Sequence, residues 1–443
     1  MIPQTAAQAE INAILDGFAA RSLAEITLGL DRIEEALARL GNPHHRLPPV
    51  LHVAGTNGKG STCAFLGSIL KAAGLKVHIF TSPHLVRFNE RITLAGEPIS
   101  DDLLAATLGR CEAAAGDLPL SYFEAVTASA FLAFAETAGD VVILETGLGG
   151  RLDATNVIDH PRAAIITPIA LDHQRFLGTE LADIAFEKAG ILKAGAAFVT
   201  GAQRHEALPV LKSRALAIGA HPHVYGEDWS FRQEAGRLVY EDEDGLRDLG
   251  LPRLAGSHQV ENAALAVAAL KAGGLLPDDQ TASYGIETAF WPARLQRLTR
   301  GPLVDRAQRH AGEHAELWLD GGHNPHAARA LARALADLDD HTPRPVILIV
   351  GMQENKDAEG FFAAFEGLAS AVFTVEAKSG TPVVKSRLAE MAQKAGLPAV
   401  PVENIAAGID QAVEETGRSG EGMPRILICG SLYLAGHVLE ENS

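Results

Sequence analysis

Residues 53–62 read Val-Ala-Gly-Thr-Asn-Gly-Lys-Gly-Ser-Thr, and this stretch decides the fold. Val50–Ala54 predicts a buried strand leading into it, and Ser61–Ala73 predicts a helix leading out of it. A glycine-rich loop between a strand and a helix suits phosphate binding, because its backbone amides can approach phosphate oxygens and the helix N-terminus adds positive charge. The sequence therefore predicts a phosphate-binding loop.

The loop departs from the usual phosphate-binding pattern in two places. Gly60 separates Lys59 from Ser61, and Val53 stands where the first glycine is expected. Lys59 still supplies a full positive charge, and the hydroxyl of Ser61 or Thr62 can bind Mg²⁺. The alternative is a glycine-rich turn with a surface lysine. The loop alone does not separate a kinase from an ATPase or a ligase.

Strand and helix patterns alternate along most of the chain, which favours an α/β fold with a mainly parallel sheet covered on both faces. Predicted strands lie at Lys76–Thr81, Val141–Glu145, Ala163–Ile169 and Ala197–Thr200, and predicted helices at Asp101–Ala114, Phe123–Thr137 and Leu181–Leu192.

A change of pattern between Pro222 and Leu254 predicts a small β element, a hairpin around a glycine turn. Helical periodicity returns at Glu261–Lys271. A second strand–helix series follows, with strands at Leu317–Leu319, Val346–Val350, Ala371–Val375 and Ile426–Cys429. We therefore predict two domains, residues 1–300 with the phosphate loop and residues 301–443 with a Rossmann-like α/β fold.

Composition narrows the classes of function. With 38 basic and 55 acidic residues the net charge is −17, which argues against non-specific binding to nucleic acid or to an anionic membrane. The three cysteines, Cys63, Cys111 and Cys429, are far apart, which predicts reduced and buried thiols. No secretory signal or membrane-spanning run is recognisable, so we expect a cytoplasmic protein, and we expect a monomer.

Further motifs follow the loop with its interposed Gly60. They are Thr81–Leu85, Arg87–Arg91, Ser121–Glu124, Leu144–Asn156, Leu171–His173, Phe186–Ile191, Asp320–Ala327 and Cys429–Ser431. Together with Gly60, these motifs resemble the folylpolyglutamate synthase/dihydrofolate synthase family, a branch of the Mur-type amide ligases. The resemblance covers essentially the whole chain, and the motifs come in the same order.

The resemblance implies a site for ATP and two Mg²⁺ ions. Ser82, Glu145 and His173 correspond to metal ligands, although Glu145 alone could be an ordinary strand-end carboxylate and His173 alone a structural histidine. The implied nucleotide contacts are Thr56, Asn57, Gly58, Lys59, Gly60, Ser61, Thr62, Asn262, Arg294 and Asp320. Arg294 follows Ala293 where the family usually has glycine.

The candidate catalytic residues are Lys59, Lys188 and His323. By resemblance Lys188 is carbamylated, which converts a cation into a carboxylate that can bind the second Mg²⁺; the alternative is a solvated helix lysine. Asn324 beside His323 is a further candidate, or a helix cap ahead of Pro325.

The resemblance also implies elements that bind the pterin of the acceptor. Phe123 could stack on the pterin or belong to the core. For L-glutamate we name only Ser431 and the loop after Val375 as candidates. The implied pterin elements are Thr27, Leu28, Gly29, Ser121, Tyr122, Phe123, Glu124, Leu152, Asp153 and Ala154.

The function implied is ATP-dependent ligation of L-glutamate to dihydropteroate, to folate-glutamates, or to both, through an acyl phosphate, within folate biosynthesis and one-carbon metabolism. The sequence motifs favour the bifunctional form. One alternative is another Mur-type ligase that adds an amino acid to a peptidoglycan precursor. The other is a P-loop kinase or regulatory NTPase.

Overall fold

The computed structural model describes residues 5–21, 28–311, 315–419 and 422–442. They form two compact units. The first unit comprises Met1–Arg253 and Val260–Ala289, and the second comprises Leu254–Gln259 and Phe290–Ser443. The first turn of helix α9 (Ser257–Ala272) is thus counted with the second unit.

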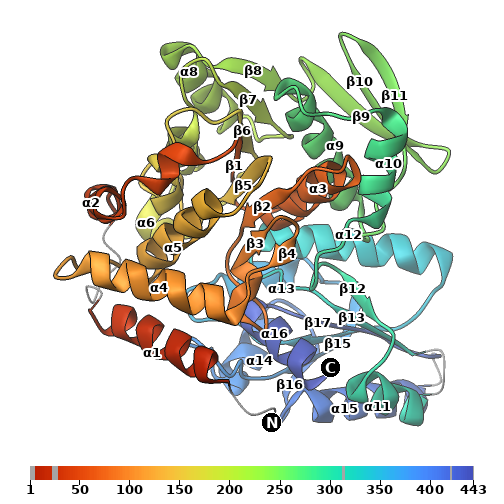
Figure 1. Cartoon of the computed structure of the whole chain (residues 1–443). Coiled ribbons are helices and arrows are strands. Elements are labelled where there is room, and N and C mark those ends of the chain that lie inside the picture. The colour runs from red at the N-terminus through yellow and green to blue at the C-terminus, as the bar shows by residue number, and fades with distance from the viewer. Residues whose placement is uncertain (1–4, 22–27, 312–314, 420–421, 443) are drawn as a thin grey trace. The chain divides into compact units, whose positions relative to one another are not determined.

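An eight-stranded sheet is the centre of the first unit (Figure 1). The strand order is β4-β3-β2-β5-β1-β6-β7-β8, in which the six strands from β2 to β8 run parallel and β3 and β4 are antiparallel additions at one edge. The strands are β1 (Val50–Ala54), β2 (Val77–Phe80), β3 (Ile92–Leu94), β4 (Glu97–Pro98), β5 (Val141–Glu145), β6 (Ala163–Ile166), β7 (Ala197–Thr200) and β8 (His221–Val224).

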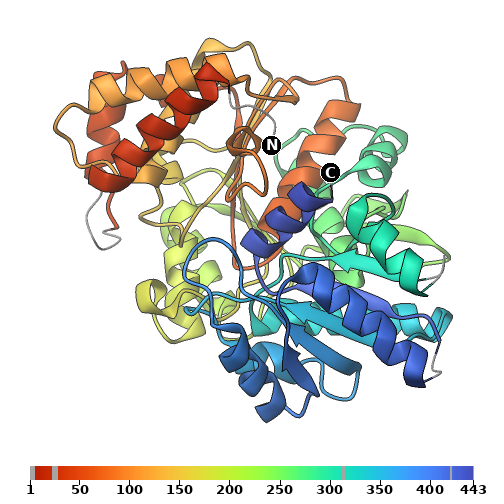
Figure 2. The same cartoon turned by 90° about the horizontal axis from the view of Figure 1, so that it is seen from below.

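Helices cover both faces of this sheet, and its central strands are therefore buried on both sides. Helices α3 and α9 lie on one face, with α10 packed on α3, whereas α5, α7 and α8 lie on the other. Figures 1 and 2 both show α1 and α4 side by side. The remaining bounds are α1 (Ala6–Arg21), α2 (Asp31–Arg39), α3 (Lys59–Ala72), α4 (Asp101–Ala115), α5 (Tyr122–Glu136), α6 (Gln174–Leu177), α7 (Leu181–Lys188), α8 (Leu208–Ile218) and α10 (Asp279–Thr288), with short 3₁₀ helices η1 (Pro43–Arg46), η2 (Phe88–Arg91), η3 (Ala154–Val157) and η4 (Ala189–Ile191).

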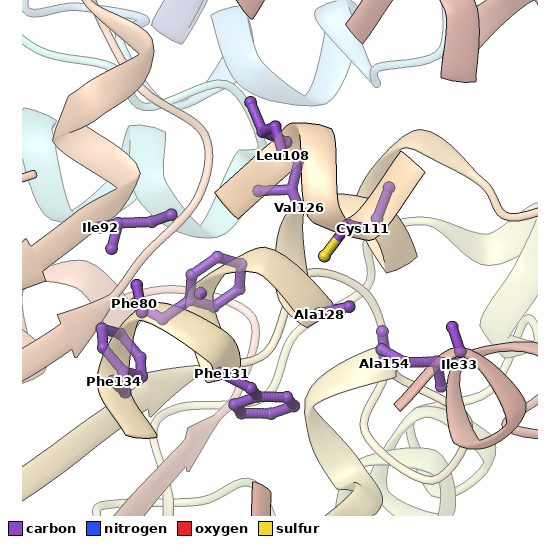
Figure 3. Close-up of a cluster of buried hydrophobic side chains, with 14 of the residues drawn as sticks. Ile33, Phe80, Ile92, Leu108, Cys111, Val126, Ala128, Phe131, Phe134 and Ala154 are labelled. Carbon is purple, nitrogen blue, oxygen red and sulfur yellow. The ribbon is translucent and has the colours of Figure 1, made fainter. Parts of the chain in front are cut away.

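A large apolar cluster joins helices α1, α2, α4 and α5 to the sheet (Figure 3). Phe80 from β2 lies with Phe131 and Phe134 from α5, and Leu108 and Cys111 from α4 belong to the same cluster. All five side chains are buried, so this packing fixes the helical layer against the strands whose carboxyl ends carry the candidate site.

A separate three-stranded antiparallel sheet interrupts the strand–helix series of the first unit. Its order is β11-β10-β9, with β9 (Trp229–Glu234), β10 (Arg237–Asp242) and β11 (Gly245–Leu249). The hairpin predicted from sequence is confirmed, and the third strand was not expected.

The second unit has a six-stranded sheet in the order β12-β13-β17-β14-β15-β16, parallel except for β12. Leu348 and Val350 of β14 pack with α12, α13 and α14, whereas Ile349 faces α15 on the other side. The bounds are β12 (Gln296–Leu298), α11 (Pro302–Ala311), β13 (Glu316–Leu319), α12 (Pro325–His341), β14 (Val346–Val350), α13 (Ala358–Ala363), β15 (Ala369–Thr374), α14 (Lys385–Lys394), β16 (Ala399–Pro401), α15 (Ile405–Ser419), β17 (Arg425–Cys429) and α16 (Leu432–Glu441).

The predicted two-unit α/β architecture is confirmed, and β1, β5 and β14 have the predicted bounds. The helix expected at Leu181–Leu192 is shorter: α7 ends at Lys188 and tightens into η4, because Gly190 lies against the backbone of Arg151. Within the described residues, no helix combines the length and the apolar character needed to cross a membrane.

Candidate functional site

The candidate site of the first unit lies where four neighbouring parallel strands end. In the sheet order β2-β5-β1-β6, the carboxyl ends meet at one edge, where ligands collect in open α/β sheets. Ser82 follows β2, Glu145 closes β5, the phosphate loop follows β1, and His173 follows β6. The topology therefore brings together motifs that are widely separated in the sequence.

The phosphate loop has a backbone that requires glycine at Gly58. Gly58 has a φ of +89°, and a Cβ there would lie 2.5 Å from Asn262 Oδ1. Asn262, a predicted nucleotide contact on α9, is 5% exposed, and the distance from Gly58 shows that its side chain lies directly against the loop. The loop is also tied to the segment after β6, since Thr56 Oγ1 donates to Ala170 O and accepts from Ala170 N, both at 3.0 Å.

Two lysines point at one carbonyl of the loop. Lys59 Nζ donates to Gly55 O at 3.2 Å and to Thr56 O at 3.3 Å. Lys188 Nζ, from the end of α7, donates to Gly55 O at 2.8 Å and is buried. Burial, and secondly the charge of Lys59, lower the pKa of Lys188 to about 7. Lys188 is therefore not the solvated helix lysine of the simpler interpretation.

Glycine contacts bring Lys188 to this position. Arg151 N donates to Glu187 O at 2.7 Å, and a Cβ on Gly150 would lie 2.8 Å from the same oxygen. A Cβ on Gly190 would lie 2.3 Å from the Cα of Arg151. The loop after β5 and the end of α7 thus touch backbone to backbone, which explains why both sequence motifs contain glycine.

Glu145 is buried at the end of β5 and accepts the backbone N–H of Ser82 at 3.3 Å. The segment that carries Ser82 is ordered by Glu90, whose carboxylate accepts the N–H groups of Leu85, Val86 and Arg87. Two of the predicted metal ligands are therefore adjacent, although the contact uses the backbone of Ser82 and not its hydroxyl.

His173 is held differently from the other two predicted ligands. It has a φ of +53°, its N–H donates to Asp172 Oδ1 at 2.8 Å, and its side chain is 39% exposed. Among the described residues no group of three or more His, Cys, Asp or Glu side chains is close enough to hold a metal. Serine and lysine are outside those residue types, so the predicted ligand set of Ser82, Glu145 and His173 stays a prediction.

Asp172 is a residue that the sequence analysis did not select. Its side chain is 9% exposed, and its negative charge acts on the pKa of Lys188 in the raising direction, against the lowering by burial and Lys59. The sequence signal that could have identified Asp172 is its position directly before His173 in the Leu-Asp-His motif. Gly55 was also missed, although its carbonyl receives both lysines.

The predicted pterin elements have structural roles in the fold. Ser121 and Glu124 form a reciprocal cap at the start of α5, and Glu124 pairs with Arg32 at 2.9 Å. Phe123 is half-buried, packs near Phe80 and lies against Gly147. Leu28 and Gly29 are half-buried, and Thr27 lies outside the described residues. None of these contacts tests pterin binding.

Asp153, another predicted pterin residue, is the end of a buried chain of hydrogen bonds. Its carboxylate accepts from Gly147 N, Leu148 N and both the N–H and the hydroxyl of Thr155. Thr155 Oγ1 then lies 2.8 Å from His52 Nε2 in the middle of β1. Because the Thr155 hydroxyl donates to Asp153, it accepts from His52, so the imidazole proton sits on Nε2. This chain fixes the loop after Glu145 to β1.

Replacing His52 with Gln should make the protein less sensitive to acid. Burial lowers the pKa of His52 to about 3, so between pH 6.5 and 3 the unfolded chain binds a proton that the folded chain does not. This group therefore removes roughly 2 kcal/mol of stability by pH 5. A glutamine amide can still donate to Thr155 but does not titrate. Urea unfolding of both proteins at pH 7.5 and pH 5 measures the difference.

The exposed His205 provides the control, since its side chain is 89% exposed. His205→Gln should leave the acid sensitivity of the wild type unchanged. An identical loss of stability in His52→Gln and wild type between the two pH values would contradict the proposed buried neutral imidazole.

The second unit contains the remaining predicted nucleotide contacts. Asp320 is buried and accepts the N–H groups of Leu295 and Gly322, both at 2.6 Å, and burial raises the pKa of its carboxyl. Arg294 Nη1 donates to Ala293 O at 2.9 Å, and Ala293 adopts a φ of +54°. A residue with a side chain thus occupies the left-handed conformation for which the family usually supplies glycine.

His323 and Asn324 follow Asp320 in the same segment. His323 Nδ1 lies 3.1 Å from Gly321 O. Asn324 caps α12 by accepting from Ala327 N at 2.9 Å, ahead of Pro325 in the first turn. The capping alternative for Asn324 is therefore confirmed, and a role for His323 in catalysis stays a prediction.

Comparisons with known proteins match two family domains along the chain. Residues 53–270 match the Mur ligase middle domain, and residues 305–432 match the Mur ligase glutamate ligase domain. The chain is 35% identical over 419 residues to the dihydrofolate synthase/folylpolyglutamate synthase of Escherichia coli K12, covering 94% of this chain and 91% of that protein. The chain belongs to the folylpolyglutamate synthase/dihydrofolate synthase family.

Solved structures of this family are also similar to the chain over nearly its whole length. E. coli FolC in complex with DHPP and ADP has a TM-score of 0.86 and 33% identity, with 99% of this chain and 98% of that chain covered. A bifunctional folylpolyglutamate synthase/dihydrofolate synthase with Mn, AMPPNP and L-glutamate bound has a TM-score of 0.83 and 31% identity, with 99% of both chains covered. The family predicted from the sequence motifs is thus confirmed.

Proposed function

We infer that this member of the family is an ATP-dependent ligase that joins L-glutamate to dihydropteroate and to folate-glutamates. The observation that carries the inference is the meeting of the phosphate loop, Glu145 and Lys188 at one sheet edge, within a chain that matches dihydrofolate synthase/folylpolyglutamate synthase over almost its whole length. The ligands of the solved relatives, a nucleotide with DHPP or with L-glutamate, fit the same reaction.

A carboxylate must be activated before it can form an amide, because its oxygen is a poor leaving group. We propose that the acceptor carboxylate attacks the γ-phosphorus of ATP, releasing ADP and forming an acyl phosphate. The amine of L-glutamate then attacks the acyl carbon, loses a proton, and expels phosphate. Lys59, already at the loop carbonyls, would exchange those contacts for phosphate oxygens and stabilise their charge during transfer.

A divalent metal fits the donor atoms present at this edge. The carboxylate of Glu145, the hydroxyl of Ser82 and the imidazole of His173 are suitable Mg²⁺ ligands when joined by water and phosphate oxygens. Thr62 Oγ1, a buried hydroxyl in the first turn of α3, has no hydrogen-bond partner among the described residues. When bound, the metal would neutralise charge on the transferred phosphoryl group. The presence of two ions remains a proposal.

Carbamylation of Lys188 is supported by its surroundings. A buried amine with a pKa lowered to about 7 is neutral in a substantial fraction of the molecules at neutral pH, and the neutral amine can attack CO₂. The nitrogen forms the new bond, one proton is lost, and the product is an anionic N-carboxylate. The remaining N–H can still donate to Gly55 O, so the existing contact need not be broken.

We expect a carbamate signal in ¹³C NMR spectra of the protein equilibrated with ¹³C-bicarbonate at neutral pH. Lys188→Arg should lack the signal and lose about a hundredfold in kcat, since arginine cannot carry the carboxylate. Lys193→Arg, the matched control at a partly buried lysine, should keep both signal and activity. A signal that persists in Lys188→Arg, or its absence from the wild type, would contradict the assignment.

The other residue roles follow from the resemblance and the contacts above. Asn262 against Gly58 is proposed to contact the adenine, Arg294 a phosphate, and Asp320 the ribose, with His323 as an additional catalytic candidate. The loops at Leu28–Gly29, Ser121–Glu124 and Leu152–Ala154 are proposed to bind the pterin, together with Thr27. We propose residues 1–300 as the ATP- and pterin-binding domain and 301–443 as the glutamate ligase domain.

An acceptor panel tests the function directly. Dihydropteroate, tetrahydrofolate and a muramyl nucleotide are each supplied with ATP, Mg²⁺ and L-glutamate, and phosphate release is measured. We expect release only when glutamate and a pteroate or folate acceptor are both present. Release with the muramyl nucleotide would favour another Mur-type ligase, and release with neither acceptor nor glutamate would favour an NTPase.

Three buried, unpaired thiols, Cys63, Cys111 and Cys429, support the cytoplasmic location proposed from sequence. The monomeric state also remains a proposal, which sedimentation velocity at micromolar concentration can test.

A further inference from the structure

A cavity of about 630 Å³ lies in the first unit at the sheet edge opposite the phosphate loop. Its walls include Arg162 just before β6, Ala197 at the start of β7 and His221 at the start of β8. The C-terminal end of α9, at Ala272–Gly274, closes another side. These parallel strands begin at this edge of the sheet, whereas the candidate active site lies at the opposite edge, where the parallel strands end, so the cavity belongs to a different surface.

The walls of this cavity are basic in an otherwise acidic protein. The chain has a net charge of −17, yet among the described residues that line the cavity none is Asp or Glu. Five carry a cationic group or an imidazole, namely Arg162, Lys271, His160, His221 and His223. Such a composition favours an anionic ligand over an apolar or cationic one.

The basic side chains that line the cavity differ in whether they already form ion pairs or hydrogen bonds within the protein. Lys271 is paired with two carboxylates, those of Asp242 and Asp244, so its single positive charge is more than balanced and is not counted toward a ligand. Arg162 donates through Nε to Gly273 O but forms no ion pair with any described carboxylate. The imidazoles of His160, His221 and His223 make no side-chain hydrogen bond to a described residue. One guanidinium and three imidazoles therefore remain available to a ligand.

Hydrogen bonds occupy most of the carbonyl oxygens at the C-terminal end of α9, beside the cavity. The carbonyls of Ala269, Leu270 and Lys271 accept N–H groups of the three residues that follow the helix, residues 273–275. Gly273 O is covered by Arg162. With these oxygens already paired, the terminal Nη groups of Arg162 keep the fork geometry that matches phosphate or carboxylate oxygens.

We propose that this cavity binds a small molecule carrying two or more oxyanion groups, through Arg162 and the three histidines. Its volume lies within the range of small-molecule sites, about 300–1,000 Å³. Two sources share this chemistry: a compound with linked phosphates, or an oligomer of glutamate with several carboxylates. The proposal concerns a site separate from the phosphate loop and holds whether or not the proposed ligase activity does.

Calorimetric titration of the full chain, saturated with Mg-ADP to occupy the phosphate loop, tests the proposal. The probes are inorganic pyrophosphate and tri-γ-glutamate. We expect one equivalent of at least one probe to bind, and Arg162→Gln to weaken that binding about tenfold or more. Arg214→Gln, at an exposed arginine on α8, is the matched control and should change the Kd by less than about twofold.

Binding of pyrophosphate alone assigns a phosphate ligand, binding of tri-γ-glutamate alone assigns a polycarboxylate, and Arg162-dependent binding of both supports the shared chemistry. The double variant His221→Gln/His223→Gln should also weaken binding, and it provides the test if Arg162→Gln does not fold. Failure of both probes to bind the wild type would overturn the proposal. Equal binding by wild type and a folded Arg162→Gln or double-histidine variant would do the same.

Discussion

Glu145→Gln should reduce kcat for glutamate ligation about a thousandfold while leaving the fold intact. Glutamine keeps the shape of the side chain and can still accept the Ser82 N–H that Glu145 receives at 3.3 Å. It removes the negative charge, however, and with it the proposed metal ligand at the end of β5. Initial rates of phosphate release with saturating ATP, glutamate and dihydropteroate measure the loss.

A matched control separates this effect from a general change in charge. Glu97→Gln removes an exposed carboxylate on β4, whose side chain is 79% exposed, and should change kcat by less than about twofold. Raising the Mg²⁺ or Mn²⁺ concentration should recover part of the activity of Glu145→Gln if the lost group is a metal ligand. Wild-type activity in Glu145→Gln would exclude that role.

Arg425→Ala should destabilise the second unit by about 3–5 kcal/mol. The Arg425 side chain is 1% exposed, and its Nε donates to Glu316 Oε2 at 2.8 Å. Its Nη2 also donates to Thr342 O at 3.2 Å. Removing the guanidinium leaves the carboxylate of Glu316, which is 11% exposed, with a weaker set of cationic neighbours. Urea unfolding, with hydrogen exchange of β13 and β17 to locate the change, measures the effect.

The exposed pair between Lys394 and Glu359 is the control, because its side chains are 70% and 57% exposed. Lys394→Ala should cost less than about 1 kcal/mol. The combined change of Glu316→Leu and Arg425→Met should cost less than the sum of the two single changes, since it leaves no buried charge unpaired. Additive losses would show that the two residues are not coupled.

Much of the candidate site could be located from sequence motifs alone. The phosphate loop, Glu145 at a strand end and the Leu-Asp-His motif were each recognisable from local pattern. The comparisons confirmed the family that these motifs resemble. Local pattern works here because a strand buried on both faces must be apolar throughout, so a single carboxylate at its end is conspicuous. The proposed role of each residue still requires the measurements above.

Other features were not readable in this way. The edge strands β12 and β16 are three residues long, too short to produce a periodic pattern, and they were missed. Helices α1 and α2 were also not expected. His52 looked like one more residue of a buried strand, because its partner Thr155 is 103 residues away and only the fold brings them together.

The sequence by itself thus determined the fold class, the family, and the positions of the phosphate loop and of Glu145, since each depends on residues close together in the chain. Only the tertiary structure decided that Lys188 reaches Gly55, 133 residues earlier, and that Arg162 faces a cavity without a carboxylate partner among the described residues. The physical reason is that burial and pairing depend on which strands are neighbours in the sheet. Strand order cannot be read from the pattern of any one strand.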